Sequence, residues 1–255
     1  MKPDRAADAD HDHYSYAAYA DPAMAQSFDK RRFSGPIGEL VAKTQARVLA
    51  NMVGRIQNRK MLDVGTGTGR AALILAAGGA KVTAVDASDE MLAIARQRAA
   101  EQMLNVTFQK GDAHALEFAD GSFDAVVSFR MLMHTPEWER CVAELCRVAV
   151  RLVIVDYPSA TSVALFESLA RRGMHAAGVT TEPYRVFTRS AIAKAFDRNG
   201  FRIRSVHRQF VLPIAFHKAI GSPRFTLWSE RVLDRAGLLK PFGSPVTLVA
   251  ERCAS

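Results

Sequence analysis

Short apolar runs and helical patterns alternate along the middle of the chain. Five short runs, bounded by polar residues and glycines, predict buried strands. The predicted strands cover residues 60–64, 81–85, 105–109, 123–129 and 150–155. Apolar residues at helical spacing predict helices at 70–77, about 89–102 and about 136–147. This alternation is typical of parallel strands joined by crossover helices. We therefore expect a doubly wound α/β sheet that binds its ligand outside the carboxyl ends of the strands.

Two of the predicted helices begin at recognisable signals. Ser88 is a plausible N-cap for the helix at 89–102, because its hydroxyl can accept a hydrogen bond from a free backbone N–H group. Pro136 stands where the helix before Arg147 is expected to start, and proline is favoured in the first turn.

The two ends of the chain are less regular than its middle. Apolar spacing between residues 23 and 54 predicts helices packed on the core, preceded by a polar, loosely ordered start. Beyond the fifth strand the pattern predicts helices at 161–172 and 190–199, a loop up to Pro183, and two paired strands at 201–212 and 246–252. We therefore divide the chain into an N-terminal helical extension or lid (1–54) and a main domain (55–255), with an insertion at about 212–245 between the last two strands.

Composition places the chain among ordinary globular proteins. Its 255 residues are 49% hydrophobic, enough for one α/β domain with a core of its own. No apolar run reaches the roughly 18 residues of a membrane-spanning helix, and the polar N-terminus does not resemble a secretory signal. Cys141, Cys146 and Cys253 show no CxxC pairing and no histidine at ligand spacing. They predict reduced thiols in a cytoplasmic protein and no metal site.

Positive charge is concentrated in the second half of the chain. Residues 1–150 hold 18 Lys and Arg against 19 Asp and Glu, whereas residues 151–255 hold 16 against 7. The whole excess of the +8 net charge therefore lies after residue 150. Such a region can meet nucleic acid, an anionic membrane or an acidic substrate, or can simply be a solvated face.

A glycine-rich turn follows the first predicted strand. Gly65, Gly67 and Gly69 let the backbone turn sharply and approach a ligand closely. A dinucleotide loop of the GxGxxG type needs glycine at position 70, where this chain has Arg70. Asp63, beside the turn, would repel a pyrophosphate. It suits S-adenosylmethionine (SAM), a nucleoside with an amino group, a sulfonium cation and no phosphate.

Acidic residues also follow the next two predicted strands. Asp86 ends the second strand, at the place where an acid typically accepts hydrogen bonds from ribose hydroxyls. Asp112 follows the third strand, where its carboxylate could accept the adenine amino hydrogen. Three acids after three successive strands, beside one glycine turn, together favour a SAM site.

Three segments carry a resemblance to a known family. The stretches LDVGTGTGR, VDAS and GDAHALEFADGSFDAVVSF resemble the class I SAM-dependent methyltransferases, near the ubiquinone/menaquinone group (methyltransferase type 11). The resemblance covers about residues 60–156, with weaker similarity at 184–187 and 199–201. It implies a Rossmann-like, mostly parallel seven-stranded sheet with an antiparallel last strand, and SAM as the cofactor.

The resemblance also implies roles for single residues. The glycine turn would hold the methionine part of SAM with Asp63 near its amine, Asp86 would bind ribose and Asp112 would lie by adenine, with Ala87 and Met91 flanking the adenosine. The candidate cofactor-binding residues are Asp63, Gly65, Thr66, Gly67, Gly69, Asp86, Ala87, Met91, Gly111, Asp112, Ala113, Ser128 and Phe129.

The segment after the fourth strand faces the transferred methyl group in this family. Residues 128–134 lack the Asn/Asp-Pro-Pro-Tyr motif of amino-methylating enzymes, and the chain shows neither a Pro-Cys nucleophile nor the paired glutamates of arginine methyltransferases. These absences favour methylation of oxygen or carbon on a small molecule. His134 is the leading candidate for a general base, since a neutral imidazole accepts protons near pH 7; the alternative is a packing or capping histidine. Asp156 and Tyr157, at the end of the fifth strand, are second candidates.

The insertion combines apolar and basic residues. Trp228 and Leu227 stand close to Arg224, Arg231 and Arg235. Within residues 212–242 this mixture suits an amphipathic element that contacts an anionic membrane peripherally; a cap over the substrate or a dimer surface are the alternatives. The acceptor would then be hydrophobic or aromatic, such as a quinone- or lipid-like molecule.

Two other functions remain open. The basic half could grip phosphates in an RNA or protein methyltransferase, although no RNA-binding module stands out and we expect no nucleic-acid partner. The chain could also be a SAM-binding protein without turnover. Near the N-terminus, Tyr14, Tyr16, Tyr19 and Phe28 could fold over the site as a lid.

Overall fold

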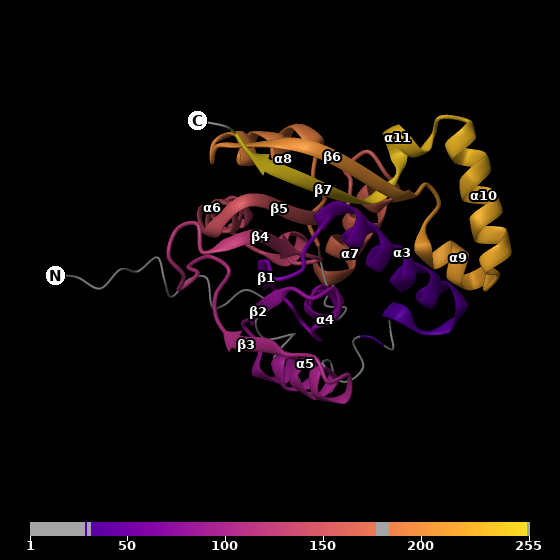
Figure 1. Cartoon of the computed structure of the whole chain (residues 1–255). Coiled ribbons are helices and arrows are strands. Elements are labelled where there is room, and N and C mark those ends of the chain that lie inside the picture. The colour runs from indigo at the N-terminus through magenta and orange to yellow at the C-terminus, as the bar shows by residue number, and fades with distance from the viewer. Residues whose placement is uncertain (1–28, 30–31, 177–183, 254–255) are drawn as a thin grey trace.

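A seven-stranded sheet runs through the part of the chain that the computed structural model describes, namely residues 29, 32–176 and 184–253 (Figure 1). The strand order is β3-β2-β1-β4-β5-β7-β6. The strands are β1 (Lys60–Val64), β2 (Lys81–Asp86), β3 (Val106–Lys110), β4 (Phe123–Ser128), β5 (Ala149–Tyr157), β6 (Phe201–Phe210) and β7 (Ser244–Arg252). The first five pair in parallel, and β7 lies antiparallel between β5 and β6. This confirms the predicted Rossmann-like sheet.

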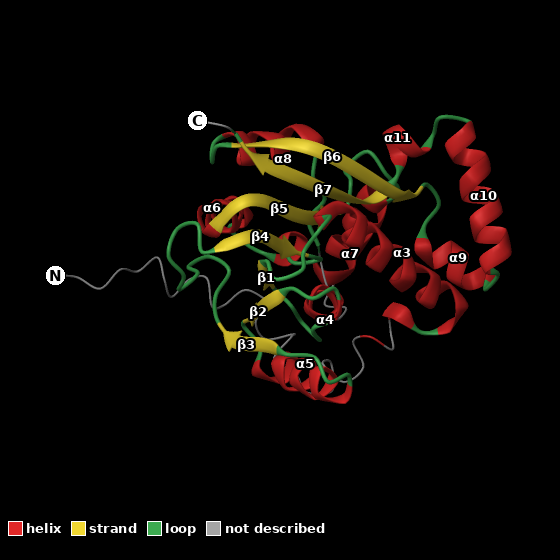
Figure 2. Cartoon of the chain, viewed as in Figure 1, coloured by secondary structure: helices red, strands yellow, loops and turns green. Residues whose placement is uncertain are grey.

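Helices cover both faces of the sheet, as Figure 2 shows in red against the yellow strands. They are α3 (Gly35–Val53), α4 (Arg70–Ala77), α5 (Asp89–Glu101), α6 (Trp138–Val148), α7 (Ala164–Ala176) and α8 (Arg189–Asp197). Alternate residues of each central strand point to opposite faces, so the core has two halves. On one face Leu62 and Val153 pack with Leu145 of α6, and on the other Ile154 packs with Leu75 of α4.

The predicted helix start at Pro136 is wrong. A short 3-10 helix, η1 (Leu132–His134), follows β4, and α6 begins only at Trp138 with Glu137 as its N-cap. The guanidinium of Arg185 donates hydrogen bonds to the carbonyls of Thr135 and Pro136, which holds this stretch outside the helix. By contrast, the predicted cap at Ser88 is confirmed, because its hydroxyl accepts a hydrogen bond from Met91 N.

The strand predicted at 201–212 ends two residues early, at Phe210. The carboxylate of Glu230 accepts hydrogen bonds from the backbone N–H groups of Val211 and Leu212, at 2.7 and 3.0 Å. These two groups therefore bond to a side chain from the insertion, and the strand stops where that contact begins.

The insertion between β6 and β7 forms three helices. They are α9 (Ile214–Ile220), α10 (Pro223–Arg235) and α11 (Leu239–Phe242). Figure 1 shows them projecting beyond α3 at one end of the sheet, and α9 and α10 both contact α3. Across the described ranges, no helix combines the length and the apolar character needed to cross a bilayer.

Some predictions fall outside the described residues. The lid aromatics Tyr14, Tyr16, Tyr19 and Phe28 do so, as do residues 177–183 of the loop expected up to Pro183. The start of that loop was wrong, because α7 continues to Ala176 where the helix was expected to end at 172. The domain division at residue 54 stays a prediction.

Candidate active site

A cavity of about 280 Å³ opens at the carboxyl ends of β1, β2, β3 and β4. It lies where a doubly wound sheet places its ligand. Asp63, Asp86 and Asp112 all line this cavity, so the structure brings the three predicted acids to one cleft. The other predicted cofactor-binding residues in its lining are Gly65, Thr66, Gly67, Ala87, Met91, Gly111, Ala113 and Phe129.

The glycine turn has the backbone that only glycine adopts readily. Gly65 and Gly67 have φ angles of 69° and 55°. A Cβ at Gly65 would lie 2.9 Å from Cβ of Met131, so Met131 leaves no room for a side chain at this position. A Cβ at Gly67 would meet no protein atom within 4 Å. The backbone at Gly67 is therefore open to close approach by a ligand.

Asp86 joins the glycine turn to the end of β2. One carboxylate oxygen accepts a hydrogen bond from Gly67 N at 2.7 Å, and the other accepts one from Ser88 N at 3.0 Å. Burial raises the pKa of Asp86, against these backbone hydrogen bonds, which lower it. The side chain thus fixes the turn while presenting its carboxylate to the cavity.

Asp63 is buried at the base of the same turn. Its carboxylate accepts hydrogen bonds from Thr66 Oγ1 at 2.6 Å and from Ala72 N at 3.0 Å. Burial raises the pKa of Asp63 to about 6, and the two hydrogen bonds oppose that rise. Near pH 7 the carboxyl is therefore mostly ionised and adds negative charge to the cavity.

This raised pKa predicts a pH-dependent contribution to stability. The folded state holds a proton on Asp63 more tightly than the unfolded chain does, since the ordinary carboxyl pKa is 3.8. The stabilisation that the protonated Asp63 carboxyl gives to the folded state is complete below about pH 4. It is lost as the pH rises through about 6. Relative to Asp63→Asn, the free energy of unfolding of the wild type should therefore fall by up to about 3 kcal/mol over this range. Urea unfolding at several pH values measures it, and a difference that does not change with pH would contradict it.

Asp112 is held beside a histidine that the sequence reasoning missed. Its carboxylate accepts a hydrogen bond from His114 N at 2.9 Å and lies 2.8 Å from His114 Nδ1. His114 is buried and also lines the cavity. The sequence could have indicated His114, because it stands only two residues after the acid that was expected to bind the cofactor.

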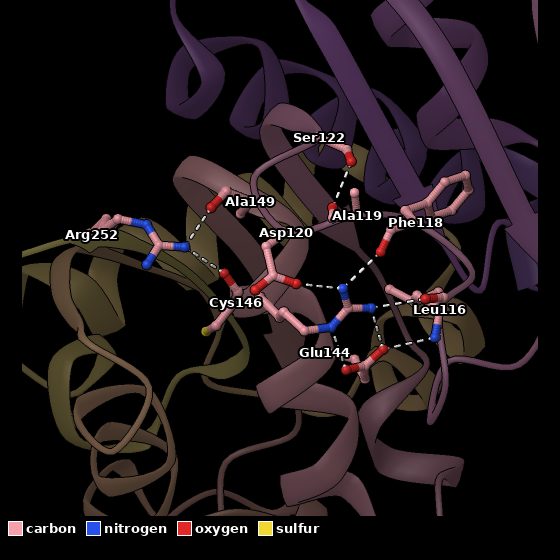
Figure 3. Close-up of polar contacts among 10 residues, drawn as sticks. Leu116, Phe118, Ala119, Asp120, Ser122, Glu144, Cys146, Ala149 and Arg252 are labelled. Carbon is pink, nitrogen blue, oxygen red and sulfur yellow. Dashed lines mark hydrogen bonds and ion pairs between the residues drawn. The ribbon is translucent and has the colours of Figure 1, made fainter.

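The loop that follows Asp112 is braced from α6, and Figure 3 shows the contacts of Leu116, Phe118, Asp120 and Glu144. The guanidinium of Arg147 donates hydrogen bonds to the carbonyls of Leu116 and Phe118 and to the carboxylates of Glu144 and Asp120. Glu144 in turn accepts one from Leu116 N at 2.8 Å. These bonds tie residues 116–120 to α6 and limit the positions open to Asp112.

The segment after β4 also lines the cavity. Phe129, Arg130, Met131 and His134 line it, and His134 is 7% exposed. Arg130 has a φ of 60°, uncommon for a residue with a side chain. Its backbone N–H donates to the carboxylate of Asp156, which supports this conformation from β5.

The structure places the second catalytic candidates outside the cavity lining, which includes neither Asp156 nor Tyr157. Asp156 is buried and bonded to the backbone of Arg130, so it positions the turn after β4. Tyr157 points to the opposite face of the sheet, where its ring packs against Phe187 with 6.0 Å between centroids. Consecutive strand residues alternate in direction, and the two cannot both face one cleft.

Two predicted cofactor residues also lie outside the lining. Ser128 is fully buried, and its hydroxyl points to the sulfur of Met131. Gly69 is the N-cap of α4, and a Cβ there would lie 2.9 Å from Cβ of Ala95. Its role in the structure is to let α4 and α5 pack closely.

The segment before α3 and α3 itself complete the cavity, and no motif had marked them. Arg32 and Phe33, before α3, and Gln45, within α3, line it together with Arg70. The Arg70 guanidinium lies 3.3 Å from the centre of the Phe33 ring, a cation–π contact. The chain before β1 therefore reaches the glycine turn.

No metal site stands out in the described part of the chain, where no group of three or more His, Cys, Asp or Glu is placed to hold an ion.

Comparisons with known proteins agree with this geometry. Residues 61–151 match the family described as "Methyltransferase domain". A demethylmenaquinone methyltransferase from Thermus thermophilus is 42% identical over 105 residues, which are 39% of this chain and 48% of that protein. The chain thus spans about half the length of this curated relative. These matches confirm the resemblance found in the sequence.

Solved structures share the fold across nearly the whole chain. A magnesium protoporphyrin IX methyltransferase from Synechocystis PCC 6803 with bound SAH has a TM-score of 0.65 at 21% identity, over 94% of this chain and 98% of its own. A [4+2]-cyclase has a TM-score of 0.59 at 22% identity, over 83% and 81%. At such identities the likeness concerns the fold, and the same fold serves different chemistries.

Proposed function

We propose that this chain, which carries a class I SAM-dependent methyltransferase domain, transfers the methyl group of SAM to oxygen or carbon of a small, apolar or aromatic acceptor. The observation that carries the proposal is the convergence of Asp63, Asp86 and Asp112 on one cavity beside an open glycine turn. A cationic nucleoside without phosphate matches this negative charge, whereas a pyrophosphate would be repelled.

The residues present fit SAM. Asp86, held by Gly67 N, would accept hydrogen bonds from the ribose hydroxyls. Asp112 would lie at the adenine amino group, and Asp63 would attract the amine of the methionine part. Each of these carboxylates is fixed by backbone hydrogen bonds, so little reorganisation is needed on binding.

The segment after β4 would hold the acceptor. Phe129 and Met131 of this segment, with Phe33 from before α3, give the cavity an apolar and aromatic surface. The relative named demethylmenaquinone methyltransferase supports a quinol-like acceptor. SAM supplies an activated methyl group, whose transfer requires in-line approach of the nucleophile in a site that excludes water. His134 would take the proton from an acceptor hydroxyl or an acidic carbon as the new bond to the methyl group forms.

We also propose that the protein works in the cytoplasm. Cys141, Cys146 and Cys253 are free thiols, as expected in a reducing compartment.

Radioactive methyl transfer tests the proposed activity. The protein is incubated with SAM carrying a tritiated methyl group, together with a reduced demethylated quinol, total RNA or a protein extract in separate reactions. We expect label in the organic-extractable quinol fraction. Label in RNA or protein instead would favour those acceptors, and SAM binding without transfer to any of them would favour a non-catalytic SAM-binding protein.

A further inference from the structure

Exposed apolar side chains gather on the helical insertion. Of the eleven large hydrophobic side chains that are exposed in the described residues, six belong to α9, α10 and α11. They are Phe216, Ile220, Leu227, Trp228, Val232 and Phe242. An insertion this short would carry far fewer if such residues were spread evenly, so this surface calls for an explanation.

The outer side of α10 mixes these residues with arginines. Leu227 and Trp228 are 51% and 62% exposed. Arg224, Arg231 and Arg235 are exposed as well, and stand four residues before, three after and seven after Trp228. This spacing places them on the same side of a helix. We call Arg224, Leu227, Trp228, Arg231 and Arg235 the docking face.

Aromatic contacts extend the docking face onto α9. The rings of Phe216 and Phe225 lie 6.3 Å apart, and those of Phe225 and Trp228 lie 6.0 Å apart. The apolar surface is therefore continuous across the two helices.

A buried polar network fixes the opposite side of these helices. Besides the backbone N–H groups at the end of β6, Glu230 contacts Nε2 of His217 at 2.8 Å. Nδ1 of His217 lies 3.1 Å from the hydroxyl of Thr226. Because α10 is anchored through Glu230 and Thr226, its arginines and Trp228 stay turned outward.

The insertion also lies next to the candidate active site. The ammonium group of Lys218 donates a hydrogen bond to the carbonyl of Arg32 at 2.9 Å, and Arg32 lines the cavity. The insertion therefore contacts a segment that lines the cavity proposed to receive the acceptor.

We propose that the docking face binds an anionic lipid bilayer. Leu227 and Trp228 enter the interface between headgroups and acyl chains, and the three arginines lie against anionic headgroups. Charge complementarity favours this partner over a second copy of the chain, since a symmetric dimer would bring like-charged arginines together. Membrane binding as such does not depend on the proposed function. The purpose that we assign to it, collecting an apolar acceptor from the bilayer, rests on the proposed function.

Vesicle flotation tests the proposal. The full chain is mixed with vesicles of phosphatidylcholine alone, or of phosphatidylcholine with phosphatidylglycerol, at low and high salt. We expect flotation with the anionic vesicles and its decrease at high salt. Leu227→Ser/Trp228→Ser and Arg231→Glu/Arg235→Glu should each lower the partition coefficient at least about tenfold. The matched control is Met103→Ser/Leu169→Ser, which removes two exposed apolar side chains elsewhere and should float like the wild type.

Fluorescence locates the contact. The chain has two tryptophans, so Trp138→Phe leaves Trp228 as the only tryptophan, which is excited selectively at the long-wavelength edge of its absorption. Its emission should shift to shorter wavelength with anionic vesicles and stay unchanged with neutral ones.

Three results would overturn the proposal: no flotation, equal flotation with both kinds of vesicle, or a dimer that the Leu227→Ser/Trp228→Ser change converts to monomer. SAM binding is measured on the same samples. Flotation without SAM binding contradicts the proposed function alone, and SAM binding without flotation contradicts the docking face alone.

Discussion

Replacing His134 with glutamine should lower kcat for methyl transfer by about a hundredfold, with SAM affinity changed by less than about twofold. The side chain lines the cavity, on the segment after β4 that is assigned to the acceptor. Glutamine keeps the ability to hydrogen-bond but cannot accept a proton near pH 7. Single-turnover rates with the quinol acceptor and calorimetry with SAM measure the two effects separately.

A second histidine provides the control for this experiment. His207 lies on β6, half-buried and outside the cavity lining, so His207→Gln should leave kcat unchanged. An unchanged kcat in the variant would mean that His134 is a packing residue.

Replacing Asp86 with asparagine should weaken SAM binding by about ten- to a hundredfold, as expected for loss of hydrogen bonds to a charged acceptor. The carboxylate now accepts hydrogen bonds from Gly67 N and Ser88 N, and asparagine can accept through only one of its two terminal atoms. The change would therefore loosen the glycine turn and remove the proposed ribose contact together. Calorimetry with SAM measures the loss.

Asp89→Asn is the matched control for that variant. Asp89 stands three residues further on, is 59% exposed and pairs with Lys110 at the surface. The same change of charge there should leave SAM affinity near that of the wild type. Equal losses in both variants would show that overall charge matters and that the position of Asp86 does not.

The sequence predicted the central sheet well because buried parallel strands read as continuous apolar runs. β1, β2 and β4 lie within a residue of their expected bounds for this reason. The convergence of Asp63, Asp86 and Asp112 was predictable too, since the carboxyl ends of neighbouring parallel strands meet at one edge.

Other parts of the site depend on contacts between distant segments. The contact between Phe33 and Arg70 could not be predicted from the residues around either one. It depends on the path that the segment before α3 takes past the edge of the sheet. The end of β6 at Phe210 was missed because it depends on a distant residue. Glu230, nineteen residues after Val211, accepts hydrogen bonds from the backbone N–H groups just after the strand. Asp156 and Tyr157 are neighbours at the end of β5, so both were expected at the site. Because strand side chains alternate between faces, the two point in opposite directions.

Calorimetric titration of the wild-type protein with SAM and, separately, with NAD tests the central claim most directly. If the cavity selects a cationic nucleoside without phosphate through its three carboxylates, SAM will bind at one site per chain and NAD will show no heat of binding. Binding of NAD with no binding of SAM would contradict the account.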